Sequence, residues 1–145
     1  MTSLLSKTWT SCPSELADIR RHIREACTGV GFTEEATNAI VLAIDEACTN
    51  IMRYAYDNCT DGVINVSVEK DDEKVRFILH DLAAQVSKDC IKVKESSILE
   101  PGGLGLVLIN QVMDSVEFTH TPKCKGNILE MTKALPDNTA KEPTA

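Results

Sequence analysis

The sequence predicts an α/β domain in which helices and strands follow one another along most of the chain. Segments 13–30 and 34–57 repeat apolar residues at helical spacing. Segments 64–69 and 75–81 alternate apolar and polar residues, as half-buried strands do. The length of 145 residues suits one domain, because a compact chain of that size buries roughly 68–70% of its unfolded surface.

The first half of the chain is expected to hold a short strand and two helices. The strand covers residues 7–10. Pro13 opens the first helix, because its fixed φ suits a first turn, and Gly29 and Gly31 end that helix. Thr33 caps the second, longer helix, which continues to about residue 57. The apolar positions that identify the two helices are Leu16, Ile19, Ile23, Ala26, Cys27 and Val30, then Ala36, Ile40, Ala43, Ala47 and Ile51.

The second half is expected to hold strands on both sides of a third helix. Asp61-Gly62 turns into the first of these strands, and the next strand ends at Asp81. Residues 82–101 show no periodicity, and an irregular segment of that length in a compact domain is usually functional, often a lid. The remaining expected elements are a helix that begins after Gly102-Gly103, strands around 115–121 and 126–133, and a small, polar, disordered tail over 136–145.

Charge and composition exclude several classes of partner. The net charge is −7, with 15 basic residues scattered among 22 acidic ones, whereas binding to a nucleic-acid backbone needs clustered Lys and Arg. No apolar run approaches the ~18 residues of a membrane span, and no secretion signal is evident at the N-terminus. We therefore expect a soluble cytoplasmic protein whose partners include neither nucleic acid nor a membrane.

The six cysteines do not form a metal-binding pattern. None belongs to a CxxC pair, and Cys27 and Cys48 fall within predicted helices. His120 and Cys124 stand four residues apart but lack a second pair of ligands. Reduced thiols are the favoured interpretation, and zinc is not expected.

A glycine-rich run, Gly102-Gly103-Leu104-Gly105-Leu106, lies where the irregular segment becomes a helix. Glycines let the backbone approach a ligand closely. The first N–H groups of a helix are unpaired, and the helix dipole favours an anion beside them. The run therefore predicts a phosphate site. A packing device or a loop hinge would look similar, and the absence of a following Gly-Lys-Ser/Thr excludes a Walker A loop.

Two polar residues on the second helix and one at a strand end could carry chemistry. Glu46 and Asn50 are one turn apart, so their side chains share a face. An amide oxygen can bind Mg²⁺, and a carboxylate can accept a proton from a nucleophile. Asp81 could accept hydrogen bonds from the exocyclic amine of adenine. Taken singly, the helical pair could equally be a solvated face and Asp81 a turn residue.

The order of these features resembles the GHKL ATPase superfamily, which has the Bergerat ATP-binding fold. The resemblance extends from about residue 7 to 135. In more detail, the chain is similar to the bacterial anti-sigma-factor serine/threonine-protein kinases. The motifs that show this similarity are Asp45-Glu46-Ala47-Cys48-Thr49-Asn50, Ala55-Tyr56, Gly102 to Leu106, and Met113-Asp114. The resemblance implies an α/β fold of the α+β two-layer type within a single domain over 1–135. Its mostly antiparallel, mixed sheet would be covered on one face by about three helices.

The resemblance also implies roles for individual residues. Glu46 would be the general base, Asn50 the Mg²⁺ ligand and Asp81 the partner of the adenine amine, so the cofactors would be ATP and Mg²⁺. The other positions that would contact the nucleotide are Arg53, Ala83, Gly102, Gly103, Leu104, Gly105, Leu106 and Asn127. The γ-phosphoryl group would pass to a Ser or Thr of a STAS-domain anti-sigma-factor antagonist. The chain would also sequester a sigma factor, and relatives of this kind are commonly homodimers.

The chain departs from the family pattern at three positions. Ala83 replaces the glycine of Asp-x-Gly, Asn127 replaces the threonine of Gly-Thr, and Tyr54 stands where a histidine is common. The alternative function is therefore a partner-switching module of the same fold that acts by docking, with little or no catalysis.

Overall fold

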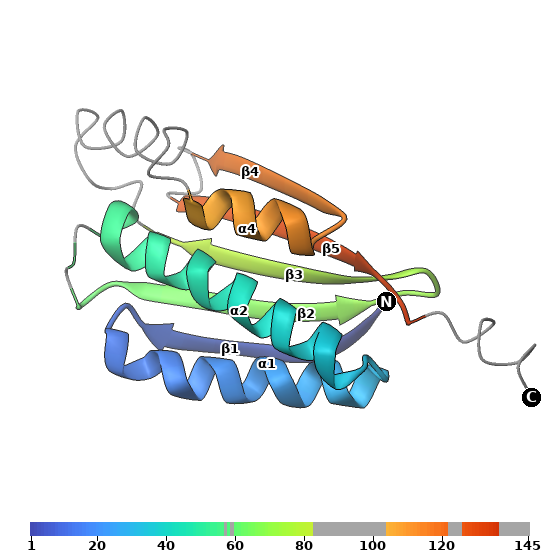
Figure 1. Ribbon diagram of the computed structural model, residues 1–145. Coiled ribbons are helices and arrows are strands. Elements are labelled where there is room, and N and C mark those ends of the chain that lie inside the picture. The colour runs from blue at the N-terminus through green and yellow to red at the C-terminus, as the bar shows by residue number, and fades with distance from the viewer. Residues whose placement is uncertain (57, 59, 83–103, 122–125, 137–145) are drawn as a thin grey trace, which may run out of the picture.

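Helices lie on one face of an antiparallel sheet in the computed structural model, which describes residues 1–56, 58, 60–82, 104–121 and 126–136 (Figure 1). The side chains of residues 104–106, 120 and 121 are not part of this description. Strand order is β1-β2-β3-β5-β4, and each neighbouring pair is antiparallel. The strands are β1 (Thr2–Thr10), β2 (Val63–Lys70), β3 (Lys74–Asp81), β4 (Ser115–Thr121) and β5 (Gly126–Ala134).

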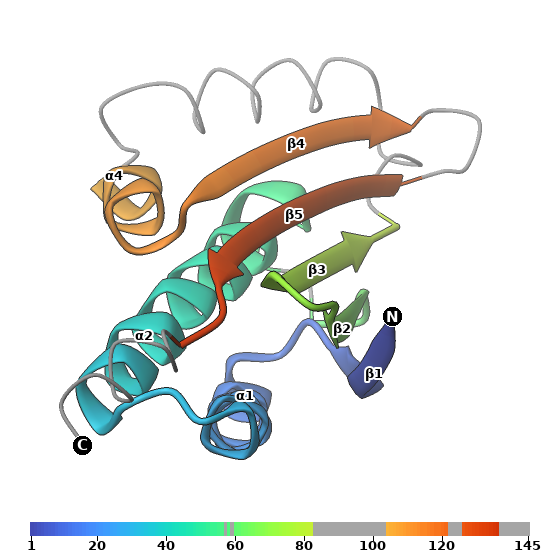
Figure 2. The same ribbon diagram turned by 90° about the vertical axis from the view of Figure 1, so that its right-hand side faces the viewer.

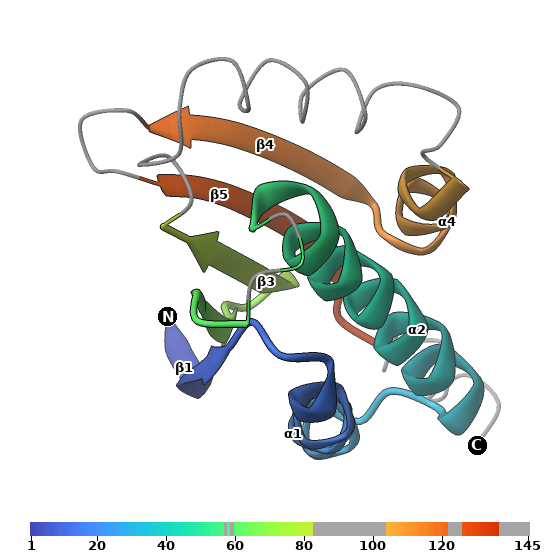
Figure 3. The same cartoon turned by 90° about the vertical axis from the view of Figure 1, so that its left-hand side faces the viewer.

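The helices are α1 (Leu16–Val30), α2 (Glu34–Asn50) and α4 (Leu104–Val112). Edge-on views show the sheet as one layer and these helices as the other (Figures 2 and 3). The two-layer prediction is thus confirmed, whereas the expectation of a mixed sheet is wrong for the described strands, which have no parallel pair. No helix in this part of the chain has both the length and the apolar character needed to cross a membrane.

Alternation along the central strands decides which face of the sheet is covered. On β2 and β3 the inward residues are completely buried, while those between them stay half-exposed on the opposite face. Burying these side chains against the apolar stripes of α1 and α2 is the main source of stability. The core residues concerned are Ile64, Val66, Val68, Val75, Phe77 and Leu79 from the strands, and Ile19, Ile23, Ile40 and Ile44 from the helices.

The ends of α1 test the predicted start and stop signals. Pro13 begins a short 3-10 turn, Pro13–Glu15, and the α-helix follows from Leu16, three residues later than predicted. The helix then continues through Gly29 and ends at Gly31, whose φ is 104° and whose N–H bonds the carbonyls of Cys27 and Thr28. Only the second glycine is therefore a helix stop, because only there does the backbone adopt the left-handed conformation that glycine allows.

The long second helix changes its geometry after Asn50. Its start is as predicted, since the Thr33 side chain accepts a hydrogen bond from the N–H of Ala36 (3.1 Å). After Asn50 the chain forms a π-helical turn, Ile51–Ala55, instead of continuing as α-helix towards residue 57. Apolar spacing over so few residues does not distinguish the two geometries, so the predicted end was wrong.

β1 begins earlier than the predicted strand over 7–10. Its residues pair with β2 from Thr2 onward, with an irregularity between Ser3 and Leu5. β1 is an edge strand, and of its side chains only that of Trp9 is buried, so most of it shows no alternating pattern. Most of the predicted irregular segment lies outside the described residues, as does the predicted tail beyond Pro136.

Asp18 ties α1 to β1. Its carboxylate accepts hydrogen bonds from Trp9 Nε1 (2.9 Å), Arg21 Nη2 (2.5 Å) and Lys7 Nζ (3.4 Å). The Lys7 ammonium also lies 5.0 Å from the centroid of the Trp9 ring. Hydrogen bonds from Trp9 and Arg21 hold the pKa of Asp18 well below its usual range. The ionised carboxylate therefore stabilises the folded state.

We expect Asp18→Asn to lower the free energy of unfolding at pH 7. The native carboxylate contributes stability above the unfolded pKa of about 3.9, and this contribution is lost as pH falls below that value. The difference between variant and wild type should therefore narrow in acid. Urea unfolding followed by the fluorescence of Trp9, the single tryptophan, measures both effects. Asp72→Asn, at an exposed position, is the matched control, and equal losses in the two variants would contradict the prediction.

Candidate active site

Several segments that carry predicted site residues begin or end on one side of the molecule. β3 ends there at Asp81, β5 begins there at Gly126, and α2 passes into its π turn there after Asn50 (Figures 1 and 3). α4, which packs against α2, begins on the same side with Leu104. The fold thus brings Glu46 and Asn50 to the same side of the molecule as Asp81 and the first turn of α4.

Asp81 and Asn127 are in direct contact. The two residues are cross-strand partners on β3 and β5, and Asn127 Nδ2 donates a hydrogen bond to Asp81 Oδ1 (2.9 Å). The Asp81 residue is 3% exposed, so this hydrogen bond fixes the orientation of a buried carboxylate. Asn127, which stands where the family has threonine, therefore positions the group predicted to bind the adenine amine.

Gly126 brings the backbone of β5 close to Asp81. A Cβ atom at this position would overlap the Asp81 carbonyl oxygen and the ring of His80. Only glycine fits between these groups without displacing them. The distance between the ends of β3 and β5, and with it the Asp81–Asn127 contact, depends on the absence of a side chain at Gly126.

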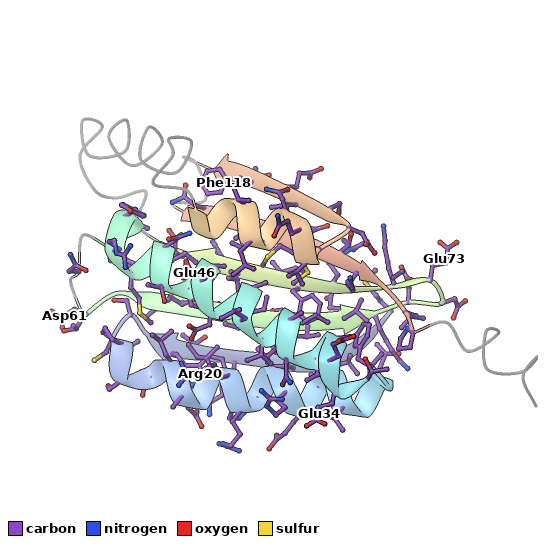
Figure 4. All side chains as sticks on the ribbon, viewed as in Figure 1. Arg20, Glu34, Glu46, Asp61, Glu73 and Phe118 are labelled. Atoms are coloured by element: carbon purple, nitrogen blue, oxygen red, sulfur yellow. The ribbon has the colours of Figure 1, made fainter. Side chains whose placement is uncertain are left out.

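Glu46 and Asn50 occupy the last turns of α2, and both are half-buried. Figure 4 places Glu46 on the stretch of α2 beside α4. The preceding residue, Asp45, is engaged elsewhere, because Arg20 on α1 donates to its carboxylate (2.8 Å). Among the described residues, the side chains of Glu46 and Asn50 have no hydrogen-bonding or ionic partner. A carboxylate and an amide oxygen are thus available to a ligand on one helix face.

Arg53, predicted to contact the nucleotide, lies in the π turn after Asn50. Regular helical spacing therefore does not place it on the face that Glu46 and Asn50 share. Arg53 is exposed, with its guanidinium carbon 5.6 Å from the centroid of the Tyr54 ring. A contact between Arg53 and nucleotide stays a prediction.

The glycine-rich run is described in part. Leu104, Gly105 and Leu106 form the first turn of α4, as the sequence predicts, and that turn contains no acidic residue that would oppose an anion. Gly102, Gly103 and Ala83 lie outside the described residues. Their predicted contacts with nucleotide stay predictions.

The residues present fit Mg²⁺ held jointly with phosphate better than a metal held by protein alone. No group of three or more His, Cys, Asp or Glu that could hold an ion occurs in the described part of the chain. Mg²⁺ commonly takes one or two protein oxygens together with waters and substrate phosphates. Asn50 can supply such an oxygen. Burial raises the pKa of the Cys27 and Cys48 thiols to about 12, so both are protonated at neutral pH.

Sequence reasoning assigned no role in this region to Gly126 or to Tyr56, which it named only within the Ala55-Tyr56 motif. The Tyr56 hydroxyl accepts a hydrogen bond from the N–H of Leu82, directly after Asp81 (2.8 Å). Neither residue belongs to an apolar or charged pattern that would single it out. Their role depends on the strand register and on the π turn.

Comparison with known proteins assigns this fold to the histidine kinase-like ATPases. The model of the histidine kinase-like ATPase domain matches residues 10–133, and the chain belongs to this family.

Within the family the chain is similar to serine-protein kinases named RsbW. That of Halalkalibacterium halodurans is 30% identical over 125 residues, which cover 81% of this chain and 74% of the relative. That of Staphylococcus aureus is 31% identical over 126 residues, which cover 78% and 77%. The resemblance to anti-sigma-factor kinases is thereby confirmed.

A solved structure shows the same fold. The crystal structure of the RsbU and RsbW domains of Rv1364c from Mycobacterium tuberculosis matches 91% of this chain with a TM-score of 0.65 and 20% identity. The match covers 33% of that longer protein.

We expect Gly126→Ala to lower the free energy of unfolding by about 1–3 kcal/mol, because the added methyl group would force the ends of β3 and β5 apart. Chemical denaturation measures the loss. Gly29→Ala is the matched control, since Gly29 lies within α1 with open space around it. Alanine there should stabilise by about 0.5–1 kcal/mol. Similar effects of the two substitutions would show that the close approach at Gly126 is unimportant.

Proposed function

We propose that the chain is an anti-sigma factor that binds ATP with Mg²⁺ and acts as a serine/threonine-protein kinase. The phosphoryl acceptor would be a Ser or Thr of a STAS-domain anti-sigma-factor antagonist, and the chain would otherwise sequester a sigma factor. The observation that supports this most directly is the half-buried pair Glu46 and Asn50, which has no partner among the described residues. The names of the RsbW relatives support the class of reaction.

Each described group has a role that suits its surroundings. Glu46 accepts the proton of the attacking hydroxyl, and Asn50 supplies an amide oxygen to the cation. Bound Mg²⁺ would neutralise charge on the phosphates and orient them. The start of α4 offers backbone N–H groups to the phosphates, and Asp81, oriented by Asn127, accepts the adenine amine.

A second candidate function is a partner-switching module that docks without catalysis. The observation that favours it is Ala83, which replaces the glycine expected after the adenine-binding aspartate. The Asp81–Asn127 hydrogen bond supports the kinase, because asparagine in place of threonine keeps a polar contact with the carboxylate proposed to bind adenine. Both candidates share the remaining proposals, which are a homodimer, a cytoplasmic location, and a sigma factor and its antagonist as partners.

We expect Glu46→Ala to slow phosphoryl transfer by roughly 10²–10⁴-fold, because general-base catalysis contributes about that much. ATP affinity should change little, since the carboxylate acts on the acceptor hydroxyl. Radiolabelled ATP, Mg²⁺ and a STAS-domain protein that binds this chain provide the assay. Glu34→Ala, at the exposed start of the same helix, is the control (Figure 4).

Two outcomes of this assay would contradict the kinase. Wild-type protein that labels no partner and gains no thermal stability from ATP would leave the docking module. Undiminished transfer by Glu46→Ala would assign the proton acceptor to another group.

We expect Asn50→Ala to weaken ATP binding at least tenfold in Mg²⁺ and much less in EDTA, because the amide oxygen acts through the cation. Calorimetric titration in the two buffers measures the ratio. Equal losses with and without Mg²⁺ would show that Asn50 has a structural role only.

A further inference from the structure

Tyr56 joins three segments at the side of the sheet where Asp81 lies. Its hydroxyl donates a hydrogen bond to the carbonyl of Val63 (2.7 Å) and accepts from the N–H of Val63 (3.3 Å). It also accepts from the N–H of Leu82 (2.8 Å). A phenolic hydroxyl has one donor and two acceptor positions, and this one uses all three on backbone groups. The chain after α2, the start of β2 and the end of β3 are thus held by one side chain.

Gly62 and Ser11 fix the backbone beside the Tyr56 ring. A Cβ at Gly62 would overlap the Tyr56 ring, so the ring lies directly against the glycine backbone. Ser11, 1% exposed, donates its N–H to the Gly62 carbonyl (2.8 Å), and its hydroxyl accepts from the Gly62 N–H (3.0 Å). The ring is therefore seated against backbone that is itself fixed.

The π turn determines where Tyr56 lies. The N–H of Tyr56 bonds the carbonyl of Ile51 (3.0 Å), five residues back rather than four. One residue more per turn changes the direction in which residue 56 points relative to a regular α-helix. The turn begins directly after Asn50, the proposed cation ligand. The end of α2 therefore also determines the position of the Tyr56 side chain, which holds the end of β3.

We propose that Tyr56 is a positioning residue for the base end of the nucleotide site. It fixes the N–H of Leu82 and thereby the path of the backbone directly after Asp81. Asp81 is then held from two directions, through its carboxylate by Asn127 and through the following peptide by Tyr56. The inference rests on the proposed nucleotide site and adds a determinant of base specificity to it.

Base specificity is the property that separates this role from a purely structural one. Adenine presents an amine where guanine presents a carbonyl oxygen, so a fixed carboxylate attracts the first and repels the second. If Asp81 gains freedom, binding of ATP weakens while binding of GTP does not. A general loss of structure would weaken binding of both nucleotides equally.

The test is Tyr56→Phe in the full chain, which keeps the ring against Gly62 and removes only the hydroxyl. Calorimetric titration with ATP and with GTP, both in Mg²⁺, gives the two dissociation constants, and urea unfolding gives the stability. We expect the ATP constant to rise about 3–10-fold, the size of one lost hydrogen bond, with the GTP constant unchanged. Tyr54→Phe is the matched control, because Tyr54 lies in the same turn with its ring beside Arg53, and both constants should stay at wild-type values.

Leu82→Pro provides an independent variant, because it replaces the N–H that donates to the Tyr56 hydroxyl with a ring carbon, which removes the hydrogen bond and displaces that hydroxyl. Asp81, already in extended backbone, tolerates a following proline. We expect Leu82→Pro to lower the ratio of ATP affinity to GTP affinity as much as Tyr56→Phe does. The double variant should lower this ratio no further than either single variant, since the hydrogen bond from Leu82 to Tyr56 is the one that both substitutions remove. If Tyr56→Phe does not fold, Leu82→Pro alone decides the question.

The outcomes separate the inference from the proposed function. Wild-type protein that binds neither nucleotide overturns both. Wild-type protein that prefers ATP, with variants that keep this preference while losing stability, overturns the role of Tyr56 and leaves the nucleotide site intact.

Discussion

The packing of α2 against the inner face of β2 and β3 is the interaction on which the rest of the structure depends. Ile40 and Ile44 are buried with Phe77 in one core, and this burial fixes the orientation of α2 over the sheet. Because α2 cannot rotate without exposing that stripe, Glu46 and Asn50 are held on the face that the core leaves open. The position of the candidate catalytic pair is thus a consequence of hydrophobic burial on the opposite side of the same helix.

Periodicity predicted the regular elements because burial imposes it. β2, β3 and most of α1 and α2 each bury one face, so their residues alternate or repeat accordingly. β1 lies at an edge with few buried side chains, so its first residues carried no such signal. The π turn escaped prediction for another reason. Its distinguishing feature is a backbone hydrogen bond to Ile51, and side-chain types do not record the spacing of that bond.

The site could be predicted from the sequence only where its members are close along the chain. Glu46 and Asn50 share one helix, so their common face follows from helical geometry. The contact between Asp81 and Asn127 joins residues 46 positions apart, and its existence depends on the register of β3 against β5. That register results from the packing of two whole strands and from the close approach at Gly126. Asn127 was therefore named from a family resemblance, while its partner became evident only in three dimensions.

The π turn also affects how this fold can change during evolution. A π turn contains one residue more than the α-helical turn it replaces, so deletion of a single residue within 51–55 could restore a regular helix. Such a deletion would leave the buried residues of α2 itself in place but would disturb the turn, where Ile51, Met52 and Ala55 belong to the core. It would also rotate the side chains after the deletion, and Tyr56 would no longer point at the start of β2 and the end of β3. A change of one codon can thus separate chains that keep the link between the helix end and the sheet from chains that lose it.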